Sequence, residues 1–89
     1  MPAIVRHKKF TSDLAKVRFA DSQFDKFVKY LSLLQAGSPL PRESSDHALK
    51  GNWQAHREFH LGGDLLVIYR ITPDAVELAR IGTHSQLFE

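Results

Sequence analysis

The feature that most constrains the fold is the segment 53–70, WQAHREFHLGGDLLVIYR, which has the pattern of a β-hairpin. Residues 67–69, Val-Ile-Tyr, are strong strand formers, and Gly62-Gly63 separates two runs that suit a pleated, half-buried surface. Glycine tolerates the positive φ values that a tight two-residue turn requires. The sequence therefore predicts two antiparallel strands joined at Gly62-Gly63.

The two strands of this hairpin differ in how their faces are composed. Because side chains alternate along a strand, the first strand has one set on one face, Trp53, Ala55, Arg57, Phe59 and Leu61, and another on the opposite face, Gln54, His56, Glu58 and His60. Residues 65–68 of the second strand are apolar on both faces, as in a central strand that is covered on both sides. We expect one face to be core and the face with titratable side chains to carry the function.

Length and composition limit the class of protein. With 89 residues, of which 43% are hydrophobic, the chain predicts a single globular domain over residues 1–89. It has no cysteine, which excludes disulfides and thiolate metal sites, and its net charge of +2 permits a nucleic-acid partner without requiring one. Neither a signal peptide nor a membrane-spanning stretch is recognisable, so we expect a cytoplasmic protein without a membrane partner.

The N-terminal half predicts a short strand and two helices. Residues 3–6 suit a strand, and residues 10–17 place an apolar stripe on a first helix. A second helix starts near Asp21 and ends at Gly37. Its stripe, which we assign to the core, consists of Phe24, Phe27, Val28, Leu31 and Leu34. The two helices are expected to form an αα hairpin.

A long loop and a last strand complete the pattern. Residues 38–52 contain two prolines and no sustained period, which predicts a loop, and so long a loop in a small domain is often functional. After a turn at Pro73, residues 75–82 alternate as a strand does. The predicted fold class is α+β: an N-terminal strand, a two-helix hairpin and a three-stranded antiparallel sheet with the helices packed on one face.

Strand register determines which polar side chains meet. A two-residue glycine turn opposes His60 to Leu65, and an even-numbered second turn opposes Val67 to Arg80. On this register one face carries His56, His60, Arg80 and His84, and the core face carries Phe59, Leu66, Ile68, Ala79 and Ile81. An odd-numbered second turn would instead move Arg80 to the core face.

Three chemistries could use such a cluster. Metal binding by the HREFH run is disfavoured, because His56 and His60 lie ~13 Å apart on a strand and the glutamate is misplaced for a zinc-protease helix. Serine chemistry lacks a nucleophile-elbow motif. General acid–base cleavage of RNA fits best, because histidines can move protons near neutral pH and Arg80 can neutralise charge on a phosphate.

Each of these residues also has a purely structural alternative. Arg80 can simply pair with Glu58, and Asp64 can simply shape the hairpin turn. His7 and His56 are expected to be ordinary surface residues. The basic cluster at residues 6–9 is either a solvated junction or a phosphate contact.

The segment DHALKGNWQAHREFHLGGDLLVIYR, followed by RIGTHSQLF, resembles the YafQ-type branch of the RelE/ParE toxin superfamily. The shared pattern is D-H-x-L-x-G-x-W, then R-[DE]-x-H, a turn aspartate, I-Y, and R-x-G-T-H-x-x-L-F; it covers residues 46–88, and the two-helix N-terminal half agrees in layout. This resemblance implies a RelE-like fold and the toxin half of a toxin–antitoxin pair. Such toxins are ribosome-dependent endoribonucleases that cut mRNA in the A site.

The resemblance also implies site residues. Matching the motifs one by one gives the catalytic set His47, His60, Asp64, Arg80, His84 and Phe88. It implies His84 as general acid, His60 or His47 as base, and Arg80 as the group that stabilises the phosphorane. Asp64 would orient a histidine or the substrate, and Phe88 would stack on a base. The basic residues expected to contact ribosomal RNA are Arg6, Lys8, Lys9, Lys16, Lys26 and Lys50.

The implied partners are a cognate antitoxin protein, the 70S ribosome and mRNA, with neither a metal nor a small-molecule cofactor. The sequence departs from its relatives at Gly63 and Leu65, where proline and tryptophan are frequent, and at Gln86, where an acidic residue is common. The alternative is a ParE-like toxin that inhibits a protein target by binding alone. A face with several histidines favours the enzyme.

Overall fold

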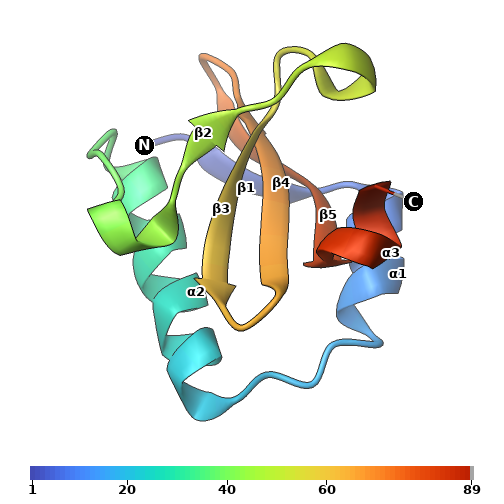
Figure 1. Cartoon of the computed structure of the whole chain (residues 1–89). Coiled ribbons are helices and arrows are strands. Elements are labelled where there is room, and N and C mark those ends of the chain that lie inside the picture. Colours follow the sequence, from blue (N-terminus) through green and yellow to red (C-terminus); the bar gives the residue numbers. More distant parts are fainter. Residues whose placement is uncertain (89) are drawn as a thin grey trace.

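A computed structural model describes residues 1–88 of the protein. Its centre is a five-stranded sheet with the strand order β1-β5-β4-β3-β2 (Figure 1). The strands are β1 (Ala3–Arg6), β2 (His47–Ala48), β3 (Arg57–Gly62), β4 (Leu65–Ile71) and β5 (Ala75–Thr83). β1 runs parallel to β5, and the other neighbours are antiparallel. The last strand in the sequence thus lies inside the sheet.

Helices cover both faces of this sheet. The α-helices are α1 (Lys8–Leu14), α2 (Asp21–Gln35) and α3 (His84–Phe88), and two 3₁₀ turns, η1 (Arg42–Ser44) and η2 (Gly51–Trp53), flank β2. α1 lies along β5 and α2 along β3, so the two predicted helices diverge more than a hairpin would (Figure 1). They meet through Phe10 and Phe27, whose ring centroids are 6.4 Å apart.

The main core lies between the sheet and the first two helices. Tyr30 of α2 packs edge-on against Phe59 of β3, and Phe59 in turn contacts Tyr69 of β4, with ring centroids 5.5 and 5.4 Å apart. All three rings are buried. Phe24 and Val28 were expected in this core and are half-exposed instead, because α2 turns its Phe27–Tyr30 side to the sheet. A smaller apolar cluster on the opposite face contains Leu66, Ile68, Ala79 and Leu87.

The α+β class is confirmed, and both predicted N-terminal helices are present, the first as a short helix over Lys8–Leu14. Two parts of the fold were not predicted: the strand β2 inside the expected loop, and the helix α3 on the second face. β2 is only two residues long, and neither element has a periodic pattern long enough to be read from sequence.

The predicted register was wrong in detail. Gly62 pairs with Leu65, so the turn residues are Gly63 and Asp64, and Leu61 is an extra residue that bulges before the turn. A second irregularity in the β4–β5 ladder makes Ile68, and not Val67, the partner of Arg80.

These shifts redistribute side chains between the faces. Leu66, Ile68 and Ala79 lie on the second face and not in the main core as expected, whereas Phe59 and Ile81 lie in the main core. His56 precedes β3 and does not oppose Tyr69, whose partner is Arg57.

Within residues 1–88, none of the helices has both the length and the apolar character that crossing a lipid bilayer demands.

Candidate functional site

A buried carboxylate brings two of the predicted histidines together. The Nε2 atoms of His47 and His60 lie 3.1 and 3.0 Å from the same oxygen, Oε2 of Glu58. Glu58 is only 5% exposed, and the two imidazole rings stack with centroids 6.2 Å apart. The sheet explains this arrangement, because His47 opposes Glu58 across the β2–β3 ladder and His60 follows two residues later on the same face.

The hydrogen-bond partners distinguish the two histidines. Nδ1 of His47 lies 2.8 Å from the carbonyl oxygen of Ser45, which can only accept, so this nitrogen carries a proton. The other ring nitrogen of His47, Nε2, lies beside the Glu58 carboxylate. Nδ1 of His60 has no partner among residues 1–88, and Oε1 of Glu58 is buried without one. Of these two histidines, His60 thus has the ring nitrogen without a neighbouring acceptor.

A second carboxylate holds the segment that carries His47. Asp46 accepts hydrogen bonds from Nε and Nη2 of Arg57, each 3.2 Å long, and from the hydroxyl of Tyr69. Burial, and then the hydrogen bond to Asp46, raise the pKa of Tyr69, and the bond to Asp46 raises the pKa of Arg57. Because neighbouring residues of a strand point to opposite faces, this contact on the core side fixes His47 on the other side.

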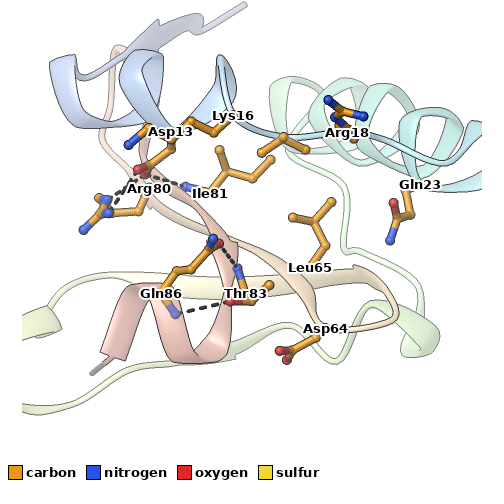
Figure 2. A pocket seen from close by; sticks show the side chains of 11 residues that line it. Asp13, Lys16, Arg18, Gln23, Asp64, Leu65, Arg80, Ile81, Thr83 and Gln86 are labelled. Atoms are coloured by element: carbon orange, nitrogen blue, oxygen red, sulfur yellow. Dashed lines mark hydrogen bonds and ion pairs between the residues drawn. The ribbon is translucent and has the colours of Figure 1, made fainter.

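Arg80 lies on the same face as Glu58, since both oppose Ile68. Its Nε and Nη2 donate to the two carboxylate oxygens of Asp13 at 2.6 and 3.0 Å (Figure 2). Burial raises the pKa of Asp13, but hydrogen bonds from Arg80 and from the Ile81 amide outweigh it and leave that pKa lowered. The same ion pair raises the pKa of Arg80.

A cavity of about 490 Å³ adjoins this ion pair between the α1–α2 linker, the β3–β4 turn and the C-terminal end of β5 (Figure 2). Its polar lining includes Lys16, Arg18, Asp64, Arg80 and Thr83, and its apolar lining is Val17, Leu65 and Ile81. The mixture of cations with apolar surface suits a ligand that has both charged and flat apolar parts. The cavity therefore offers cationic groups beside an aliphatic wall.

The motif R-x-G-T-H-x-x-L-F spans residues 80–88, the end of β5 and the helix α3, which together we call the α3 unit. Thr83 and Gln86 make a reciprocal capping box: the Gln86 amide donates to the Thr83 hydroxyl at 3.2 Å, and the Gln86 side chain accepts from the Thr83 amide at 2.9 Å. Buried Leu87 anchors the helix on the sheet. A Cβ atom at Gly82 would lie 2.8 Å from Oε1 of Gln86, which accounts for glycine there.

This unit presents the last two predicted site residues. The rings of His84 and Phe88 lie one helical turn apart with centroids separated by 4.8 Å, and His84 is exposed. Gln86 accepts the same capping hydrogen bond that a glutamate would, so this departure from the relatives is structurally neutral.

The predicted site residues thus fall into three groups: His47 with His60, Asp64 with Arg80 at the cavity, and His84 with Phe88. Four of the predicted basic residues line hollows that adjoin these groups. Lys8 and Lys9 line a smaller cavity next to Arg80, Lys16 lines the larger one, and Lys50 lies in a shallow hollow with Phe88. Arg6 is exposed on β1 and Lys26 is exposed on α2.

No role was predicted from sequence for Asp13 or Asp46, and the alternative of an Arg80–Glu58 pair was wrong, because Arg80 pairs with Asp13 and Glu58 contacts the two histidines. Asp46 and Glu58 belong to the D-H and R-[DE]-x-H motifs, so their positions were visible, although their roles were not. Asp13 stands in a helix of ordinary composition and gave no signal.

One cluster has the donor set of a metal site. Ligand atoms of His47, Glu58 and His60 lie within 4.8 Å of one another. Two imidazole nitrogens and a carboxylate oxygen suit copper or zinc. The sequence analysis weighed the pair His56 and His60, which is a different combination.

The comparisons with known proteins agree with this architecture. The family model described as "Bacterial toxin of type II toxin-antitoxin system, YafQ" matches residues 3–89. The chain is 36% identical over 75 residues to the mRNA interferase toxin YafQ of Escherichia coli K12, which covers 84% of this chain and 80% of that protein.

Two solved structures are similar along their whole length. A copper-bound L66S mutant toxin from Helicobacter pylori has a TM-score of 0.87 and 34% identity, over 99% of this chain and 100% of that one. YafQ in the E. coli DinJ–YafQ complex has a TM-score of 0.82 and 32% identity, over 100% of both chains. The chain belongs to the YafQ family of toxins from bacterial type II toxin–antitoxin systems.

Proposed function

We propose that the protein is a ribosome-dependent mRNA endoribonuclease that cleaves by metal-independent acid–base chemistry. The observation that carries this proposal is the His47–Glu58–His60 cluster, which shares a sheet face with Arg80. The name of the E. coli relative, an mRNA interferase, supports the same reaction class. A toxin that acted by binding alone would not need a buried carboxylate to hold two histidines.

The reaction would be an attack of a 2′-hydroxyl on the adjacent phosphate. A base removes the hydroxyl proton, the O2′–P bond forms, the P–O5′ bond breaks, and an acid protonates the leaving O5′. The products of this step are a 2′,3′-cyclic phosphate and a 5′-hydroxyl. Attack of water on the cyclic phosphate, with cleavage of the O2′–P bond, then gives a 3′-phosphate. Each positioned acid or base contributes about 10²–10⁴-fold to such a rate.

We assign the base to Nδ1 of His60, because it is the ring nitrogen of the cluster without a partner among the described residues. Glu58 orients both rings, and His47 braces the carboxylate from the β2 side. His84 is the general acid, Arg80 neutralises charge on the phosphorane, and Phe88 supports or stacks on a base. Asp64, on the rim of the cavity, positions the substrate.

Affinity for RNA would come from the ribosome. Lys8, Lys9, Lys16 and Lys50 line hollows next to the proposed site residues, and with Arg6 and Lys26 they would contact ribosomal phosphates. Each phosphate contact releases counterions, so ribosome binding should weaken steeply with salt. Naked mRNA, which lacks these contacts, should be cleaved far more slowly than mRNA on programmed ribosomes.

We also propose that a cognate antitoxin silences the protein in the cytoplasm. The E. coli relative was solved in complex with DinJ, its antitoxin in that toxin–antitoxin pair. Co-expression with the product of the neighbouring reading frame should yield a tight complex and restore growth.

The decisive experiment compares wild type, His84→Ala and His7→Ala on programmed ribosomes. His84→Ala should reduce cleavage ~10²–10⁴-fold while leaving ribosome binding intact. His7, whose Nε2 atom lies 3.2 Å from Glu77, is the control of the same residue type and should cleave at the wild-type rate. Normal cleavage by His84→Ala would remove this residue from the mechanism, and a wild type that binds ribosomes without cleaving would favour the ParE-like alternative.

A second proposal concerns the metal-binding potential of the same cluster. We propose that His47, Glu58 and His60 bind a copper ion, as the copper-bound H. pylori toxin suggests, and that the ion competes with catalysis by occupying both histidines. Copper titration followed by calorimetry should detect a site that His47→Ala weakens, whereas chelators should not reduce cleavage. Cleavage that is lost on chelation would contradict a metal-independent mechanism.

A further inference from the structure

The Asp13–Arg80 pair differs from an ordinary surface ion pair in how many groups it fixes. Asp13 accepts two hydrogen bonds from the guanidinium in a fork, which is the strongest and most directional arrangement for an arginine. Its Oδ2 atom also accepts the backbone amide of Ile81 at 3.1 Å. One carboxylate therefore holds both the head of Arg80 and the backbone that follows it.

The position of Asp13 in the fold explains this double contact. β1 pairs with β5 only as far as Leu78, after which the chain leaves the sheet and enters α1. The next part of β5 would be an edge without a partner, and a buried amide there would be costly. Asp13, in the last turn of α1, accepts the hydrogen bond of the Ile81 amide, for which the sheet has no further strand on this side (Figure 2).

We propose, on the basis of the proposed RNA cleavage, that Asp13 is a positioning residue for Arg80. It holds the Nε–Nη2 edge of the guanidinium and leaves Nη1, which has no hydrogen-bond partner among residues 1–88, for the scissile phosphate. Arg80 lines both the larger cavity and the smaller one beside Lys8 and Lys9, so a phosphate could reach it from either.

Two effects of Asp13 on Arg80 oppose each other, and they predict opposite results. If Asp13 mainly neutralised Arg80, its removal would strengthen RNA binding and increase cleavage. If it positions Arg80, its removal leaves a long side chain free to sample many rotamers, and the rate of the chemical step falls. Misplacement by about 1 Å is enough to cost ~10²-fold in rate.

The test is a double-mutant cycle on programmed ribosomes with Asp13→Asn and Arg80→Ala. We expect Asp13→Asn to lower kcat ~10–100-fold, with KM little changed, and to have no further effect once Arg80 is alanine. Asp25→Asn, an exposed aspartate on α2, is the matched control and should cleave normally. If Asp13→Asn does not fold, Asp13→Glu keeps the carboxylate and should retain more activity than Asp13→Ala.

A direct readout of position accompanies the kinetics. In the wild type, the ¹⁵Nε–Hε resonance of Arg80 should be protected from solvent exchange, and Asp13→Asn should remove that protection. Undiminished cleavage by Asp13→Asn, or an equal loss in the Arg80→Ala background, would overturn the inference while leaving the proposed function intact. A wild type that cleaves nothing on ribosomes would overturn both.

Discussion

The two faces of the sheet are held in place by different kinds of contact. The face toward α1 and α2 is held by apolar contacts among large buried rings, such as those of Tyr30, Phe59 and Tyr69. The opposite face has a small apolar cluster around Leu66 and Ile68, and its order comes from carboxylates paired with histidine or arginine. The first face tolerates exchange of one apolar residue for another of similar volume, whereas the second depends on individual atoms.

This difference separates stability from activity. Apolar burial is nondirectional, so it supplies stability without fixing any single atom. Charge-assisted hydrogen bonds are directional and fix atoms at a cost in desolvation, so they contribute less net stability. We therefore expect substitutions on the core face to be seen in unfolding, and those on the site face to be seen chiefly in cleavage.

The largest expected effect on stability is that of Phe59→Ala. This ring is fully buried between Tyr30 and Tyr69, so its removal should lower the free energy of unfolding by about 3–5 kcal/mol. Urea unfolding followed by circular dichroism measures the loss. Phe24→Ala is the matched control, since that ring is 50% exposed, and it should cost much less. Equal losses would mean that the rings of α2 and β3 do not form the core described above.

Asp46→Asn should affect both stability and cleavage, because Asp46 makes its contacts on the core side of the sheet and fixes His47 on the other side. The loss of a carboxylate bonded to Arg57 should cost about 1.5–3 kcal/mol in unfolding and should also slow cleavage. Asp74→Asn, in the exposed turn before β5, should change neither quantity. An Asp46→Asn protein with normal stability and reduced cleavage would place Asp46 in the chemistry itself.

The α3 unit offers a smaller effect that is confined to the site face. Thr83→Ala removes the capping hydroxyl and should cost about 0.5–2 kcal/mol of helix stability, so that His84 and Phe88 lose their fixed position and cleavage falls. Thr83→Ser keeps the hydroxyl and should behave as wild type, and Gln86→Glu should keep the capping box. Unchanged cleavage by Thr83→Ala would show that the cap is not needed to hold His84.

The smallest effect is the pH dependence of the Asp13 contribution to stability. The folded-state pKa of Asp13 lies below its ordinary value of 3.8, so its ion pair contributes fully above that pH and is lost as pH falls through the lowered value. The difference in unfolding free energy between wild type and Asp13→Asn should therefore shrink as the pH is lowered from about 5 to about 2. A difference that grew on acidification would contradict the lowered pKa.

The same contrast explains what could be predicted from sequence. The core face depends on periodicity, so the burial of Phe27 on α2 and of Phe59 and Ile81 on the sheet could be predicted even though the register was wrong. The site face depends on two ladder irregularities, at Leu61 and near Ala79, which no local pattern reveals. The prediction placed Arg80 opposite Val67, whereas Arg80 pairs with Ile68. This pairing still places Arg80 on the face that carries Glu58.

The carboxylates were beyond prediction for a related reason. Asp13 and Asp46 act across long separations in sequence: Asp13 and Arg80 are 67 residues apart, and Asp46 and Tyr69 are 23 apart. Such pairs leave no periodic signal in a single chain. The family motifs marked the positions of Asp46 and Glu58, and the structure adds the contacts that explain why those residue types stand there.

The location of β5 has a consequence for the order of folding. β5 comes last among the described strands in the sequence, yet it lies between β1 and β4 and carries Arg80. Until residues 75–83 are in place, β1 has no partner in the sheet and Asp13 has no guanidinium to hold. Since a chain folds progressively as it is made, we expect the sheet and the proposed site to form together, late in folding, and not from the N-terminal half alone.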